Sequence, residues 1–167
     1  MAGIMSNQME ARCRFASLVI VEQEGKYLLI KESKQACRNK WFLPGGRAEP
    51  KESIVQTAVR ETKEESGLDV ELTGLAYLDQ LLDSDPAGSG HRIRFFFRGK
   101  PAGGELKTFE DDHSICAGWF SEADAAQLEL RSPIVPDILK LCRGAPAILP
   151  ISRIHILSRE DILRERP

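Results

Sequence analysis

Apolar and polar positions in the first part of the chain predict two short β-strands joined by a turn. Residues 15–21 (FASLVIV) form an apolar run rich in β-branched side chains, which indicates a central strand. Glu24-Gly25 predicts a turn, and residues 27–30 (YLLI) predict the second strand. Residues 32–40 are polar and are expected to form a loop.

The second half of the chain contains further alternating stretches. Residues 68–82 alternate loosely and predict one or two strands, and residues 83–90 (DSDPAGSG) predict a flexible loop at a chain reversal. Residues 91–98 alternate cleanly, which predicts a strand with two distinct faces. One face carries Ile93, Phe95 and Phe97, and the other carries Arg92, Arg94, Phe96 and Arg98.

The remaining pattern predicts one more strand and two helices. Pro101 to Gly104 indicates a turn, residues 106–113 a polar, acidic loop, and residues 115–120 a short strand. Ser121 is a candidate cap for a short helix that reaches Leu128, and a further helix is expected at 133–142.

The clearest pattern is a helix between Ser53 and Gly67. Ser53 can cap its N-terminus, with Gln56 completing a capping box, and Gly67 can end it in a left-handed conformation. At about 100° per residue, the apolar side chains fall within one stripe of roughly 140° that should face the core. The stripe consists of Ile54, Val55, Ala58, Val59 and Thr62.

Three carboxylates lie beside this stripe near the end of the helix. Glu61 and Glu65 border the stripe and Glu64 is next to them, so the acidic part still points toward the body of the protein. Their repulsion and partial burial are unfavourable unless a cation compensates. Arg60 can reach Glu64 at the i, i+4 spacing, but one guanidinium does not neutralise three carboxylates. The pattern indicates a Mg²⁺ site, because hard cations prefer oxygen ligands; a solvated acidic helix end is the alternative.

Composition narrows the functional classes. At 167 residues the chain fits one domain, and its net charge of −2 argues against a broad surface for duplex nucleic acid. No apolar run approaches the length of a membrane span, and the first 15 residues lack the apolar core of a secretory signal. The four cysteines, which show no C-x-x-C pairing, are therefore expected to be reduced thiols in a cytoplasmic protein. The expected organisation is a flexible lead-in at 1–14, a folded domain at 15–143 and a C-terminal arm at 144–167.

Residues in and before the predicted helix resemble the signature of the Nudix hydrolases, G-x5-E-x7-R-E-U-x-E-E-x-G-U, in which U is a bulky aliphatic residue. Thr62 is the one departure, because an aliphatic residue is usual there. Threonine is β-branched and can still face a core. The matching residues are Gly46, Glu52, Arg60, Glu61, Glu64, Glu65, Gly67 and Leu68. We call the helix that ends this signature the box helix.

This resemblance implies a fold and a reaction. The fold is the Nudix α/β/α sandwich, in which a mixed β-sheet has the box helix on one face and later helices on the other. The reaction is hydrolysis of a diphosphate linkage in a nucleoside diphosphate attached to some other group, with Mg²⁺ as cofactor and Mn²⁺ as an expected substitute. Metal ions held by carboxylates suit phosphoryl transfer, which depends on positioning and on neutralising oxygens.

The resemblance also implies roles for individual residues. Glu61, Glu64 and Glu65 are the expected metal ligands, with Glu52 and the Gly46 carbonyl as further candidates. Glu64 is the first candidate for the base that deprotonates the attacking water, and Glu61 is the second. Arg60 is expected to orient Glu64 or Glu52.

Substrate contacts must come from outside the signature. Trp41 and Phe42 either fill the core beneath the helix or line a wall on which a nucleobase stacks. Arg94 either lies on a solvated face or holds substrate phosphates. Asp111 and Asp112 either belong to a hydrated loop or accept hydrogen bonds from a purine.

The segments that flank the box helix look most like the branch that hydrolyses oxidised guanine nucleoside diphosphates such as 8-oxo-dGDP. An ADP-ribose or nucleotide-sugar diphosphatase is an alternative, and a Nudix-fold module that senses nucleotides without hydrolysing them is another. The expected partner is a small nucleotide substrate, without duplex nucleic acid or membrane, and a homodimer is left open.

Overall fold

The computed structural model describes residues 12–82, 90–144 and 148–154. Its first two strands, β1 (Arg12–Gln23) and β2 (Lys26–Glu32), are the predicted pair, each longer than expected. They pair antiparallel only next to the turn, where Glu24 and Gly25 both have positive φ. Because β1 and β2 separate beyond the turn, another strand can pair with β1 there.

One mixed sheet organises the fold, in the order β3-β2-β1-β6-β5-β8, with β4 also paired to β1 and β7 to β2. The pairing of β1 with β6 is parallel, and the other pairings are antiparallel. Besides β1 and β2, the strands are β3 (Trp41–Phe42), β4 (Gly45–Arg47), β5 (Leu68–Leu81), β6 (Gly90–Gly104), β7 (Ser114–Phe120) and β8 (Leu149–Pro150).

The turn predicted at Pro101 to Gly104 is wrong, because these residues continue β6. They pair with the first residues of β5, as Leu68 opposite Gly104 and Val70 opposite Pro101. The register shifts between Asp69 and Val70, so one bulge absorbs the mismatch. Glycine and proline here mark an irregular strand end. The flexible loop predicted at 83–90 lies outside the described residues except for Gly90, which begins β6.

The box helix is α1 (Ile54–Ser66), with the predicted capping box of Ser53 and Gln56 and with Gly67 left-handed at φ 78°. The prediction that Val59 faces the core is wrong, because its side chain is exposed. Val59 lies about 100° around the helix from the buried Ala58, at the edge of the predicted stripe. The fully buried positions are Thr57, Ala58, Thr62, Glu65 and Ser66.

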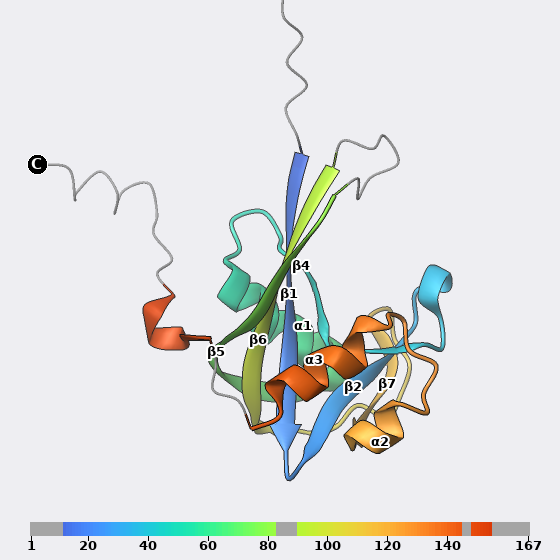
Figure 1. Cartoon of the computed structure of the whole chain (residues 1–167). Coiled ribbons are helices and arrows are strands. Elements are labelled where there is room, and N and C mark those ends of the chain that lie inside the picture. The colour runs from blue at the N-terminus through green and yellow to red at the C-terminus, as the bar shows by residue number, and fades with distance from the viewer. Residues whose placement is uncertain (1–11, 83–89, 145–147, 155–167) are drawn as a thin grey trace, which may run out of the picture.

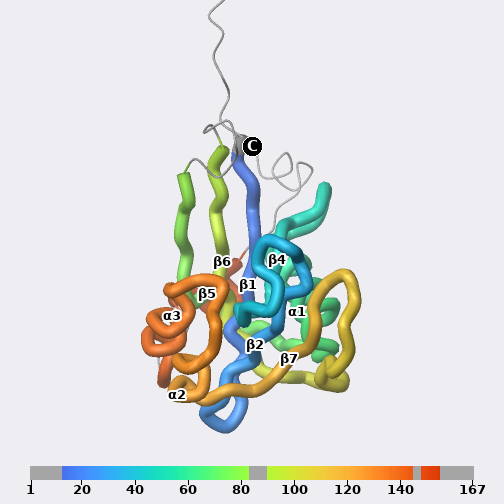
Figure 2. The backbone as a smooth tube through the Cα atoms, turned by 90° about the vertical axis from the view of Figure 1, so that its right-hand side faces the viewer, coloured from blue at the N-terminus to red at the C-terminus, as the bar shows by residue number. Residues whose placement is uncertain are grey.

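Helices cover both faces of the sheet, as Figures 1 and 2 show. α1 packs with Val19, Phe97 and their neighbours on one face. On the other face, α2 (Glu122–Ala125) and α3 (Ile134–Cys142) pack with a second core that includes Leu18 and Phe96. The predicted α/β/α sandwich with a mixed sheet is thereby confirmed, although α2 ends before Leu128. Short 3₁₀ helices are found at Gln35–Cys37 and Ile151–Arg153.

Part of the predicted C-terminal arm packs on the domain. β8 pairs with β5 at Gly74 and Leu75, and residues 155–167 lie outside the description. All four cysteines fall within the described residues and are free thiols. No helix in the described part of the chain is long and apolar enough to cross a membrane. The domain limits of 15–143 stay a prediction, although β1 already begins at Arg12.

Candidate active site

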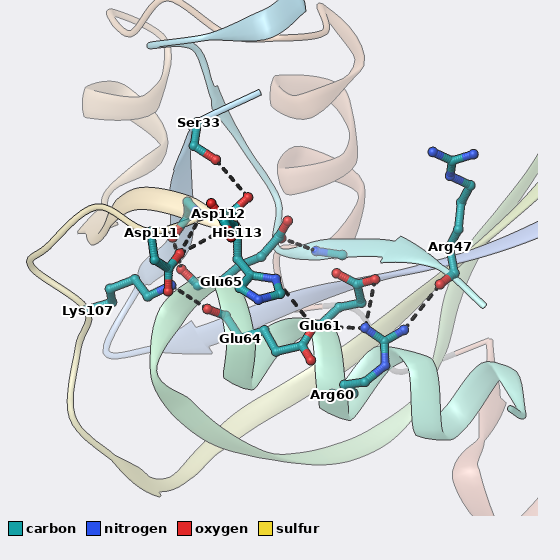
Figure 3. Close-up of polar contacts among 12 residues, drawn as sticks. Ser33, Arg47, Arg60, Glu61, Glu64, Glu65, Lys107, Asp111, Asp112 and His113 are labelled. Carbon is teal, nitrogen blue, oxygen red and sulfur yellow. Dashed lines mark hydrogen bonds and ion pairs between the residues drawn. The ribbon is translucent and has the colours of Figure 1, made fainter. Parts of the chain in front are cut away.

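Arg60 joins three of the four glutamates that the sequence singles out, and Figure 3 shows its contacts with Glu61, Glu64 and Arg47. Its Nε lies 2.7 Å from Oε1 of Glu52, and its Nη1 lies 3.1 Å from Oε1 of Glu61 and 2.9 Å from Oε2 of Glu64. Its Nη2 donates to the Arg47 carbonyl at 3.2 Å. The guanidinium fork therefore fixes the relative positions of these carboxylates and ties the helix to β4.

Glu52 is fully engaged in this network. Besides the two bonds from Arg60, its carboxylate accepts bonds from the Thr57 hydroxyl at 2.9 Å and the Glu49 amide at 3.0 Å. The bonds from Arg60 are the main reason that the pKa of Glu52 falls to about 2. Glu52 therefore holds Arg60 in place, and both of its carboxylate oxygens already accept hydrogen bonds.

Glu61 lies directly against Gly46. A Cβ built on Gly46 would come within 2.2 Å of Glu61 Oε1, so only glycine leaves room for the carboxylate at this place. The Glu61 side chain is 12% exposed. Burial raises its pKa, and the neighbouring Arg60 opposes that rise.

Glu65 is the most deeply buried carboxylate of the box helix, with its side chain 2% exposed. Its Oε2 accepts a hydrogen bond from the Gly45 amide at 2.8 Å, and its Oε1 lies 3.7 Å from Lys34 Nζ. Burial raises its pKa to about 8 despite the Gly45 bond. A buried carboxylate with so little compensation favours a cation nearby.

Glu64 is the most accessible of the three predicted ligands, with its side chain 32% exposed. Beyond Arg60, its Oε2 lies 3.6 Å from His113 Nδ1 (Figure 3). Its backbone carbonyl accepts a bond from Lys107 Nζ. An accessible carboxylate held by an arginine suits a group that exchanges protons with water.

Asp111 and Asp112 lie in the loop that precedes β7. Asp111 accepts from Lys107 Nζ at 2.7 Å and from the amides of His113 and Ser114, and it organises this loop. These bonds outweigh its desolvation and lower its pKa to about 2. Asp112 is exposed, and its carbonyl accepts from Ser33. Neither side chain lines a cavity described below.

Trp41 and Phe42 lie in different surroundings in the structure. Trp41 packs edge-on against Phe120 at a centroid distance of 4.7 Å, which matches the core reading. Phe42 is 4% exposed and borders a cavity, where the Arg131 guanidinium lies 4.9 Å from its ring centroid. The ring face of Phe42 is therefore already covered by a cation.

A cavity of about 530 Å³ adjoins these residues, a size typical of small-molecule sites. Its floor includes Ala16, Leu18 and Phe42. The cationic and anionic side chains that line it are Lys34, Arg47, Glu49, Glu61, Arg92, Arg94 and Arg131. The cavity thus has a carboxylate at one end, Glu61, and several arginines elsewhere in its lining. This arrangement suits an anionic ligand that binds to the carboxylate end through a cation.

The sequence singles out Arg94, and the structure places it in this cavity, held by Asp79 through two bonds. Arg92 and Arg131 are missed as site residues. Alternation does put Arg92 on the same face as Arg94, which is the signal that identifies it. Arg131 follows α2 in an irregular segment, where no periodicity shows which way a side chain points.

A divalent cation fits the donors at the carboxylate end. Glu65 is buried and Glu61 is largely buried, so burial raises the pKa of both carboxylates, and Gly46 is a candidate for adding a backbone carbonyl. In the part of the chain that is described, no three His, Cys, Asp or Glu side chains are already gathered as a metal site. All available ligands are oxygens, which Mg²⁺ prefers, and Mg²⁺ commonly completes its shell with water and substrate phosphate.

The chain is similar to several known proteins. The NUDIX domain model matches residues 12–142. The 8-oxo-dGDP phosphatase NUDT18 of Mus musculus is 37% identical over 150 residues, which is 83% of this chain and 43% of that protein. The ADP-ribose pyrophosphatase of Methanocaldococcus jannaschii is 38% identical over 92 residues, which is 55% of this chain and 53% of that protein. This chain spans less than half the length of the NUDT18 relatives.

Among solved structures, a NUDIX hydrolase from Nitrosomonas europaea aligns with a TM-score of 0.72 and 25% identity over 87% of this chain and 98% of that chain. The fold, the Gly46–Leu68 signature and the family model agree. The chain belongs to the NUDIX family.

Proposed function

We propose that the protein hydrolyses the diphosphate linkage of a nucleoside diphosphate derivative, with oxidised guanine nucleotides such as 8-oxo-dGDP as its substrates. The observation that carries this proposal is the cavity that joins the largely buried Glu61 to several arginines. A nucleotide can use both ends of this cavity. Its phosphates would bind to the carboxylates through a cation, and its sugar and base would occupy the rest of the cavity.

Mg²⁺, or Mn²⁺ in its place, would neutralise the phosphate oxygens and lower the pKa of a bound water. Glu61, Glu64 and Glu65 and the Gly46 carbonyl are the groups that would hold it. Arg60 keeps Glu61 and Glu64 in register, and Glu52 keeps Arg60 in place. This arrangement supports a positioning role for Arg60 and Glu52.

Glu64 is the proposed base, and Glu61 is the second candidate. Glu64 is more exposed than Glu61, and Arg60 holds one of its oxygens. It would accept a proton from the water that attacks one phosphorus of the linkage, and the bridging oxygen would leave with the other phosphate. No group of the protein needs to become covalently attached.

The substrate branch rests on the similarity to the 8-oxo-dGDP phosphatase relatives. The likeness to an ADP-ribose pyrophosphatase keeps that activity as the second candidate. A nucleotide sensor without activity is the third, and the complete set of glutamates argues against it. The four free thiols support the proposed cytoplasmic location, and a homodimer stays open.

A substrate comparison tests this proposal. The kcat/KM values for 8-oxo-dGDP, dGDP and ADP-ribose are measured with Mg²⁺, and Glu64→Gln prepared in parallel controls for contaminating phosphatases. We expect 8-oxo-dGDP to exceed dGDP, and both to exceed ADP-ribose. A preference for ADP-ribose would replace the substrate branch. Binding of these nucleotides without any product would support the sensor.

A further inference from the structure

Among the arginines that line the cavity, Arg92 has a buried nitrogen without a partner, whereas the side chain of Arg47 is exposed to solvent. Arg94 is held by Asp79 through two bonds, and Arg131 is bonded to Glu32. Arg92 makes no hydrogen bond or ion pair with any residue in the described ranges, and its Nε is fully buried without a partner. A buried donor without an acceptor is costly, so the position calls for an acceptor from outside the chain.

The surroundings of Arg92 contain more donors and few acceptors. Arg14, Arg47, Arg94 and Arg131 are close enough to help burial lower its pKa. Arg92 and Arg94 share one face of β6 with the buried Phe96, and Ala16 of β1 pairs in register with Arg94. Ala16 lines the cavity beside Arg92 and Arg94, so a ligand in the cavity can reach these guanidinium groups.

Part of the cavity lining is apolar. Ala16, Leu18 and Phe42 form this part, and all three are buried. A phosphate gains nothing from apolar side chains, whereas the face of a purine ring does. Because the Arg131 guanidinium covers Phe42, the ring would pack on Ala16 and Leu18. The ligand that fits is thus a flat ring whose edge carries hydrogen-bond acceptors. These acceptors would face the arginine donors of the cavity.

Purines differ at this edge. Guanine presents the acceptor oxygen O6, and oxidised guanine adds a second carbonyl oxygen at C8. Adenine presents an amino group at C6, which would point N–H bonds at an arginine. In nucleic-acid recognition, arginine bonded to both O6 and N7 of guanine is a common specific contact, and one good bidentate pair contributes roughly ten- to hundredfold discrimination. In 8-oxoguanine N7 carries a hydrogen, so O6 and the oxygen at C8 are the acceptors on this edge.

We propose that Arg92 reads the C6 carbonyl of the substrate base and makes the cavity selective for 6-oxopurines over 6-aminopurines. This inference rests on the proposed nucleotide hydrolase function and assigns its base specificity to one residue. It replaces Asp111 and Asp112 as the groups that recognise the base, because both lie outside the cavity.

Binding of nucleoside monophosphates without metal tests this inference independently of hydrolysis. Isothermal titration calorimetry is done with dGMP, dIMP and dAMP on the wild type, Arg92→Gln and Arg92→Lys. Arg143→Gln is the control, since Arg143 is exposed and pairs with Glu122 away from the cavity. The wild type should bind dGMP and dIMP about ten- to hundredfold more tightly than dAMP. Arg92→Gln should lose most of this ratio, and Arg143→Gln should keep it.

Three results would overturn the proposal. One is equal loss of affinity for all bases in Arg92→Gln, which would make Arg92 a phosphate contact or a structural residue. The second is an unchanged ratio in that variant. The third is a wild type that binds dIMP no more tightly than dAMP. This measurement uses the wild type alone, so it does not depend on whether a variant folds. A preference for ADP-ribose in hydrolysis would instead contradict the proposed function. The ratio of the affinities for dGMP and dAMP would still test the role of Arg92.

Discussion

The α-carbon of Gly46 and the carboxylate of Glu61 are so close that no side chain fits between them. A Cβ on Gly46 would lie 2.2 Å from Glu61 Oε1 and 2.3 Å from its Cδ. Gly46 and Glu61 are 15 positions apart in the chain, yet the observed position of the Glu61 carboxylate requires a glycine at position 46. The glycine sets where the carboxylate can be.

Gly46→Ala should displace Glu61 and lower kcat/KM by about 10²-fold, since a shift of about 1 Å at a reacting centre can cost that much. Steady-state kinetics with 8-oxo-dGDP measures the effect. Gly25→Asn is a matched control, because a Cβ at Gly25 meets nothing within 4 Å and asparagine tolerates its positive φ. Wild-type activity in Gly46→Ala would show that the position of Glu61 is not critical.

Mg²⁺ should raise the melting temperature of the wild type. A ligand that binds only the folded state stabilises it by about 2.7 kcal/mol at about 100 times its Kd. Thermal scans with and without millimolar Mg²⁺ measure the shift, which should vanish in the double variant Glu61→Gln/Glu65→Gln. A wild-type melting temperature that ignores Mg²⁺ would remove the metal-site assignment.

Glu64→Gln should lower turnover by about 10²-fold or more, because glutamine keeps the shape and cannot take a proton. Its melting temperature should stay near that of the wild type, since the Glu64 side chain is partly exposed at the edge of the helix. Single-turnover kinetics separates this loss from product release. Near-normal turnover would transfer the role of base to Glu61.

Glu52→Gln should lower the free energy of unfolding at neutral pH by about 1–3 kcal/mol, because it weakens charge-assisted bonds to Arg60. The folded-state pKa of Glu52 is about 2, below its ordinary value of 4.5. A lowered pKa stabilises the fold above the ordinary value, and this contribution is lost as the pH falls toward 2.

Urea unfolding of wild type and Glu52→Gln measures this dependence. The difference between the two should be full near pH 7 and much smaller near pH 3. A difference that stays constant over this range would mean that the variant acts through packing and not through the ionised pair.

The position of Glu52 illustrates what tertiary structure adds to a motif. Spacing alone places Glu52 eight residues before Arg60 and leaves it as a metal candidate. In the structure the chain bends between β4 and α1, and both Glu52 oxygens are used by Arg60, Thr57 and Glu49. Local sequence carries no information on such competition between partners.

The sequence by itself determined the box helix, its two caps, the grouping of Glu61, Glu64 and Glu65, and the two faces of β6. These depend on interactions within a few residues, whose geometry follows from the helix and strand periods. Tertiary structure alone decided that Trp41 belongs to the core, that Asp111 organises a loop, and that Arg92 and Arg131 meet in one cavity. Those outcomes depend on contacts between segments far apart in the chain, where the direction of a side chain is set by packing of the whole sheet and its helices.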